Sequence, residues 1–123
     1  MPGVPLIAMV DDDDALRNSL DNLLRSVGLR VQGFVSAEAF LQAQHAPETV
    51  CLILDVRLPG MNGLELQRQL VAAHWGMPII FVTAYADDDA RARALAAGAV
   101  AFLSKPCREG DLLHAIEVTL KHA

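Results

Sequence analysis

Aspartates stand directly after two short apolar runs of the chain. Asp11 to Asp14 follow the run LIAMV, and Asp55 follows the run CLIL. Carboxylates that crowd together repel one another unless one is protonated or a cation lies among them. Oxygen ligands suit Mg²⁺ or Ca²⁺, and Mg²⁺ also keeps waters and binds phosphate oxygens. If the fold brings the two runs together, Asp11, Asp12 and Asp55 are candidate ligands of such a cation.

A hydroxyl and an ammonium group follow two later apolar runs. Thr83 ends the run PIIFVT, and Lys105 comes directly after FLS. With Asp55 as a nucleophile, these groups describe a pocket for a transient phosphoryl group, because an aspartyl phosphate is an established covalent intermediate. Phosphoryl transfer depends mostly on positioning and charge neutralisation, which Mg²⁺ and Lys105 would supply.

Each candidate also has a purely structural interpretation. Asp13 or Asp14 is expected to be a solvated acid or a helix N-cap. Thr83 could simply end a strand, and Lys105 could be a surface lysine before a turn proline. For Asp11 and Asp12 the metal interpretation is favoured, because both directly follow a buried strand and face Asp55, another aspartate at a strand end.

Short apolar runs alternate with longer helical patterns along the whole chain, as in an α/β protein. Strands are expected at Leu6–Val10, Arg30–Val35, Cys51–Asp55, Pro78–Thr83 and Val100–Leu103. Helices are expected from Ala15 to a C-cap at Gly28, from Ser36 to before Pro47, and over Leu64–His74, Asp87–Ala97 and Arg108–Lys121. The fourth helix is alanine-rich, with Leu95 as its one large apolar anchor.

This alternation predicts a flavodoxin-like (βα)5 fold, a doubly wound five-stranded parallel sheet in the order 2-1-3-4-5. In that order the second strand lies at an edge, and strands 1 and 3 are neighbours. Ligands of such folds bind at the carboxyl ends of the strands. Asp11, Asp12, Asp55, Thr83 and Lys105 would therefore converge on one rim.

Composition excludes several other classes of protein. The 123 residues make one domain, and their net charge of −5 argues against direct nucleic-acid binding. No apolar run approaches a membrane span, and the N-terminus lacks the features of a signal peptide. Two cysteines are too few for a disulfide framework and are expected to be reduced thiols in a cytoplasmic protein.

Two other functions of related chemistry fit poorly. A flavin-binding module would need a Ser/Thr/Gly-rich phosphate loop where this chain has four aspartates, which would repel a phosphate. A haloacid-dehalogenase-type phosphatase would need an Asp-x-Asp-x-Thr/Val signature, but residue 15 is alanine.

Four motifs in order, VDDDD, LDVRLPGMNG, VTAYAD and FLSKP, identify a family resemblance. The chain resembles the receiver domain of two-component response regulators over essentially its whole length. The stretches DALRNSL, SAEAFL and DVRLPGMNG are most similar to the FixJ-type subgroup.

The resemblance implies a role for each acidic residue of the rim. Asp55 matches the aspartate that accepts a phosphoryl group from a histidine kinase. Asp11 and Asp12 match the acidic pair that holds Mg²⁺, and the backbone carbonyl of Arg57 matches the remaining protein ligand. Arg57 and Tyr85 flank the pocket at positions that vary in the family, where we expect them to set the rate of dephosphorylation.

The resemblance also implies a switch. Thr83 matches the hydroxyl that moves to the phosphoryl oxygens, and Lys105 matches the lysine that pairs with them. Phe102 matches the aromatic residue that turns inward with Thr83, although an aromatic in an apolar strand is plain core at least as often. The Lys105-Pro106 bond is expected to be cis.

The expected function is therefore that of a signalling domain rather than an enzyme, one that assists its own phosphorylation and dephosphorylation. Its partners would be a sensor histidine kinase and, after phosphorylation, a second receiver bound through the surface of helix 4, strand 5 and helix 5. Residues 1–123 would form the receiver, followed in the full protein by a DNA-binding effector domain that controls transcription. The alternative is a stand-alone regulator that acts by protein–protein binding.

Overall fold

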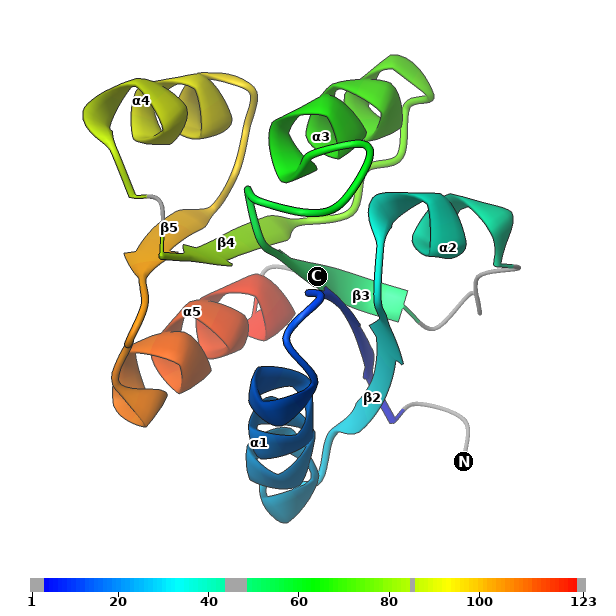
Figure 1. Ribbon diagram of the computed structural model, residues 1–123. Helices are drawn as coiled ribbons and strands as arrows, with labels where there is room; N and C mark the ends of the chain where they lie inside the picture. Colours follow the sequence, from blue (N-terminus) through cyan, green and yellow to red (C-terminus); the bar gives the residue numbers. More distant parts are fainter. Residues whose placement is uncertain (1–3, 44–48, 85, 122–123) are drawn as a thin grey trace.

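The computed structural model describes residues 4–43, 49–84 and 86–121, in which five strands alternate with five helices (Figure 1). The strands are β1 (Leu6–Val10), β2 (Arg30–Phe34), β3 (Thr49–Leu54), β4 (Ile79–Thr83) and β5 (Ala101–Ser104). The helices are α1 (Asp14–Ser26), α2 (Ala37–Gln42), α3 (Gly63–Ala72), α4 (Asp88–Ala96) and α5 (Glu109–Lys121). None of the helices within these described ranges is long and apolar enough to cross a bilayer.

The strands form one parallel sheet in the order β2-β1-β3-β4-β5, which confirms the predicted topology and the edge position of β2. The central strands β1, β3 and β4 are buried over most of their length, as their near-continuous apolar runs predict. Val10 pairs with Leu54, so β1 and β3 end at the same level. The residues that follow these two strands are therefore neighbours.

Alternate residues of each strand face two separate apolar layers. One layer lies under α2, α3 and α4, with Phe40, Leu66 and Phe81 among its fully buried members. The other lies under α1 and α5, with Leu24 and Leu112 from those helices. Figure 1 shows the two helical layers on opposite faces of the sheet, with α1 and α5 below it in that view. The sheet is doubly wound, as predicted.

Polar side chains cap four of the helices at their N-termini. Asp13, Ser36 and Asp87 each accept a hydrogen bond from the amide three residues later, which starts α1, α2 and α4. Asn62 and Glu65 form a reciprocal capping box at the start of α3. Asp13 thus has the structural role expected for it, and the acids of α4 lie at the positive end of the helix dipole.

The C-terminal ends of α1 and α3 differ from those predicted. Gly28, at φ 88°, lies one residue beyond the C-cap Val27 and closes a Schellman motif. The predicted helix Leu64–His74 ends at Ala72, because His74 adopts a left-handed conformation at φ 58°. The Trp75 amide then bonds the carbonyl of Leu70, so the same type of cap ends α3 without a glycine. The predicted extension of α2 towards Pro47 falls partly on residues 44–48, outside the described ranges.

Helix α4 is attached by small side chains rather than by its leucine. Leu95 is 39% exposed, so the expectation that it anchors the helix is wrong; the buried residues of α4 are Ala90 and Ala94. The buried Gln67 of α3 donates to the Ala94 carbonyl at 2.9 Å and lines hollows of about 360 and 350 Å³ beside α4. Because little apolar area holds α4, it is the helix best suited to shift.

The two cysteines are free thiols on the α1/α5 side of the sheet. Cys51 is fully buried in β3, and burial raises the pKa of its thiol to about 12. Cys107 is partly buried, and burial likewise raises its pKa. Burial therefore favours the protonated thiol at both positions.

Candidate functional site

The candidate site lies where β1 and β3 end side by side. The Asp55 amide donates to the Val10 carbonyl at 3.1 Å, which continues the sheet by one residue past β3. Asp11 likewise extends β1, because its amide donates to the Phe34 carbonyl. Both carboxylates are nearly buried, with Asp11 3% and Asp55 5% exposed. Sheet pairing thus holds the backbones of two acidic residues next to each other.

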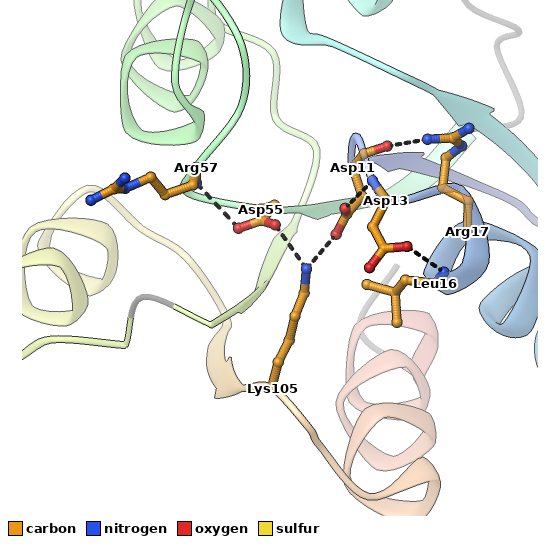
Figure 2. Close-up of polar contacts among 7 residues, drawn as sticks. All are labelled: Asp11, Asp13, Leu16, Arg17, Asp55, Arg57 and Lys105. Carbon is orange, nitrogen blue, oxygen red and sulfur yellow. Dashed lines mark hydrogen bonds and ion pairs between the residues drawn. The ribbon is translucent and has the colours of Figure 1, made fainter.

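Lys105 joins these two carboxylates. Its Nζ lies 2.8 Å from Asp55 Oδ2 and 2.9 Å from Asp11 Oδ2 (Figure 2). The lysine follows β5, and its amide donates to the Thr83 carbonyl at the end of β4. The Lys105-Pro106 peptide is cis, as expected. Residues that are far apart in the chain therefore place one ammonium between two acids.

Asp55 is held by the main chain on its other side. Its Oδ1 accepts a hydrogen bond from the Arg57 amide at 3.1 Å (Figure 2). The following loop returns to Gly63, whose amide donates to the Val56 carbonyl. Both oxygens of the Asp55 carboxylate are thus oriented, one by Arg57 and one by Lys105.

The loop Asp11–Asp14 turns from β1 into α1. Asp11 Oδ1 accepts from the Asp13 amide at 2.9 Å, and the Asp13 side chain accepts from the Leu16 amide at 3.1 Å. Asp12 stands between them with an exposed side chain. Asp11 is therefore fixed, whereas Asp12 faces solvent at the mouth of the site.

Burial and charge act in opposite directions on Asp11 and Lys105. Burial raises the pKa of Asp11, although the Asp13 amide and Lys105 partly offset this effect. Burial lowers the pKa of Lys105, but the Asp55 and Asp11 carboxylates outweigh it, so that the net shift is upward. Lys105 is thus a firmly protonated cation inside the site.

Carboxylate oxygens of Asp11, Asp12 and Asp55 all lie within 4.8 Å of one another, so these residues could hold a metal ion. An all-oxygen donor set is what a hard divalent cation prefers. The Arg57 amide bonds Asp55, which keeps the main chain of Arg57 beside this cluster. The residues present therefore fit the expected cation.

The remaining predicted residues lie on the adjoining strands. Thr83 is fully buried at the end of β4, and Phe81 of that strand pairs with Leu54, so Thr83 lies at the same edge of the sheet as Asp55. Phe102 is buried in β5, with its ring centroid 5.7 Å from that of Phe81. Phe102 thus already faces the core. Tyr85 lies outside the described residues.

Three polar residues near the site and α4 have roles that the sequence did not reveal. Arg17 donates to the Asp11 carbonyl, Glu38 accepts from the Met61 amide, and Gln67 bonds α4. The only available signal was the place of Gln67 between Leu66 and Leu70, on the buried stripe of its helix. Arg17 and Glu38 each bond a main-chain group outside their own helix, the Asp11 carbonyl and the Met61 amide, which no local pattern indicates.

Comparison with known proteins identifies this arrangement. Residues 7–117 match the model of the response regulator receiver domain. The chain belongs to this family. The match places it among signalling regulators rather than in an enzyme family.

Receiver domains from several regulators are similar to this one in sequence. The chain is 48% identical over 111 residues to nodulation protein W of Bradyrhizobium diazoefficiens, covering 90% of this chain and 49% of that protein. It is 38% identical over 117 residues to the transcriptional regulatory protein FixJ of the same organism, covering 95% and 57%. The chain thus spans about half the length of these relatives.

Solved receiver structures have the same fold. The response regulator StyR matches with a TM-score of 0.88 at 48% identity, over 97% of this chain and 60% of that one. The structure named FixJ-N matches with a TM-score of 0.86 at 36% identity, over 97% and 95%. These matches confirm the predicted receiver family, including its FixJ-type relatives.

Proposed function

We propose that this receiver accepts a phosphoryl group from a sensor histidine kinase on Asp55, in the presence of Mg²⁺. The observation that carries this proposal is the pairing of the buried Asp55 with Lys105 at 2.8 Å, beside Asp11 and Asp12. A buried nucleophile flanked by a fixed cation and further oxygen ligands suits phosphoryl transfer, which needs positioning and charge neutralisation.

In the proposed reaction, an Asp55 carboxylate oxygen attacks the phosphorus of a phosphohistidine. The P–O bond forms as the P–N bond breaks, and the electron pair stays on the departing imidazole. Lys105 pairs with the phosphoryl oxygens, while the Arg57 amide orients the carboxylate. Asp11, Asp12, Asp55 and the carbonyl of Arg57 would hold Mg²⁺, which when bound neutralises phosphoryl charge.

The proposed switch runs through Thr83 and Phe102. A phosphoryl group adds a charge of about −2 and strong acceptor oxygens, which would draw the Thr83 hydroxyl and Lys105 towards Asp55. Arg91 of α4 donates to the Phe102 carbonyl at 3.1 Å, so a change at Phe102 would reach α4 directly. The weak apolar attachment of α4 supports its role as the moving part.

The proposed output is a phosphorylation-dependent homodimer through the surface of α4, β5 and α5. In the full protein, an effector domain after residue 123 would bind DNA and control transcription in the cytoplasm. The length of the relatives, about twice that of this chain, and names such as transcriptional regulatory protein support this proposal. A stand-alone regulator that acts by protein binding is the alternative, and chain length in the native gene product distinguishes the two.

Intact mass after incubation with acetyl phosphate tests the acceptor. The wild-type protein should gain one phosphoryl group with Mg²⁺ but not with EDTA, and Asp55→Asn should gain none. A phosphorylated histidine kinase serves as a second donor. A folded wild-type protein that gains no mass from either donor would refute the proposed function.

A further inference from the structure

Arg17 lies beside the loop Asp11–Asp14, on the opposite side of Asp11 from Lys105 (Figure 2). Its Nη1 donates to the backbone carbonyl of Asp11 at 2.5 Å, and its Nη2 pairs with the Asp14 carboxylate. The side chain is only 17% exposed, although Arg17 belongs to the first turns of a surface helix. One guanidinium group therefore binds both ends of the loop Asp11–Asp14.

The stem of Arg17 is also confined by the sheet. A Cβ atom on Gly33 of β2 would lie 3.3 Å from Arg17 Cδ, so the side chain runs close over the backbone of that edge strand. The carbonyl of the next residue, Phe34, accepts a hydrogen bond from the Asp11 amide. Arg17 is thus held between α1 and β2 while its donors face the loop.

We infer that Arg17 is a positioning residue for the metal and phosphoryl site, an inference that rests on the proposed function. By holding the Asp11 carbonyl and the Asp14 carboxylate, it fixes the loop backbone from which Asp11 and Asp12 project. A contact to the carbonyl leaves the Asp11 carboxylate free for the Asp13 amide and Lys105. Groups that orient metal ligands in this way typically contribute 10- to 100-fold to metal affinity.

Positioning and charge predict opposite effects on Mg²⁺ binding. If Arg17 acted only through its charge, its removal would strengthen Mg²⁺ binding, because the acidic cluster would lose a nearby positive charge. If it acts by fixing the loop, removal weakens binding. Lysine keeps the charge but lacks the planar fork of two donors, so Arg17→Lys should also weaken binding.

The test measures the Kd for Mg²⁺ by isothermal titration calorimetry on the wild-type chain, Arg17→Met and Arg17→Lys. Arg25→Met is the matched control, since Arg25 on the same helix also pairs with a carboxylate, Asp21, and a backbone carbonyl, that of Val31. We expect Mg²⁺ binding roughly tenfold weaker for both Arg17 variants and unchanged for Arg25→Met. Urea unfolding in EDTA verifies that each variant is folded.

A further variant leaves the arginine in place. Valine at position 33 suits a β-strand, but its side chain would crowd the methylene groups of Arg17. Gly33→Val should therefore also weaken Mg²⁺ binding. If Arg17→Met does not fold, the Kd values of Arg17→Lys and Gly33→Val for Mg²⁺ test the inference in its place. Wild-type affinity in these two variants, or tighter binding by Arg17→Met, would overturn the inference while leaving the proposed function intact. A wild-type chain that neither binds Mg²⁺ nor accepts a phosphoryl group would overturn both.

Discussion

Gly63 packs against the main chain of Asp55 so closely that a Cβ atom at position 63 would lie 2.0 Å from the Asp55 carbonyl oxygen. The Gly63 amide donates to the adjacent Val56 carbonyl at 2.8 Å, which closes the intervening loop. The loop therefore starts at the proposed phosphoryl acceptor and ends against it. Any side chain at position 63 must displace the backbone of the acceptor.

We predict that Gly63→Ala lowers the free energy of unfolding by about 2 kcal/mol, because the added methyl group overpacks a backbone contact. It should also slow phosphorylation of Asp55, because the acceptor moves. Urea unfolding and the intact-mass time course measure the two effects. Gly110→Ala is the control: its Cβ would meet nothing within 4 Å in helix α5, and it should be neutral or stabilise by up to about 1 kcal/mol. Equal effects at both positions would contradict the prediction.

Removing the charge of Asp12 should separate metal binding from folding. With Mg²⁺ at ten times its Kd, the wild-type chain should gain about 1.4 kcal/mol of stability over the EDTA form. Asp12→Asn should lose most of this gain, since Asp12 is one of the three clustered carboxylates. In EDTA the variant should be as stable as the wild-type chain or more stable, by up to ~1 kcal/mol, because repulsion within the cluster falls.

Thermal unfolding with and without Mg²⁺ measures this difference. Asp21→Asn, in the middle of α1, provides a matched loss of one charge and should keep the full response to Mg²⁺. An Asp12→Asn protein that Mg²⁺ stabilises as much as the wild-type chain would exclude Asp12 as a ligand.

Glu38 of α2 bonds the loop that follows β3, and its contribution to the stability of the chain should depend on pH. Its Oε2 accepts from the Met61 amide at 2.8 Å, and this hydrogen bond lowers the pKa of Glu38 below its ordinary value of 4.5. A carboxyl group with a lowered pKa in the folded state adds stability above its unfolded pKa, and this contribution disappears as the pH falls through the folded pKa.

The stability difference between the wild-type chain and Glu38→Gln should therefore be full at pH 6 and shrink as the pH falls below about 4.5. Glutamine keeps a carbonyl acceptor, so the variant isolates the charge. Urea unfolding of both proteins between pH 3 and 7 checks this. A difference that stays constant over that range would show that the charge plays no part.

The buried hydrogen bond of Gln67 should control the mobility of α4. Gln67→Leu preserves volume but removes the bond to the Ala94 carbonyl, at a cost of about 1 kcal/mol. Because Ala90 and Ala94 are the buried residues of α4, we expect its amides to exchange roughly fivefold faster. Hydrogen exchange followed by mass spectrometry measures this effect. Gln69→Leu changes an exposed residue of α3, the helix that also carries Gln67, and should leave the exchange of the α4 amides unchanged.

The order of the motifs was enough to predict the fold and the meeting of Asp11, Asp55 and Lys105 at one edge of the sheet. Buried parallel strands are apolar on both faces, so the polar residue that ends each run marks the carboxyl edge of the sheet. The strand order then places Asp11 and Asp55 side by side, as the structure shows. These features depend on local patterns and on rules of connection, both of which a single sequence contains.

Other relationships were decided only by the tertiary structure. Arg17, Glu38 and Gln67 act through backbone groups of other segments, and backbone groups are identical in every sequence. Leu95 was expected to be an anchor because of its residue type, yet the position of α4 leaves it 39% exposed. The sequence by itself determined which residues meet at the sheet edge; the packing of helices and loops against one another decided what holds them there.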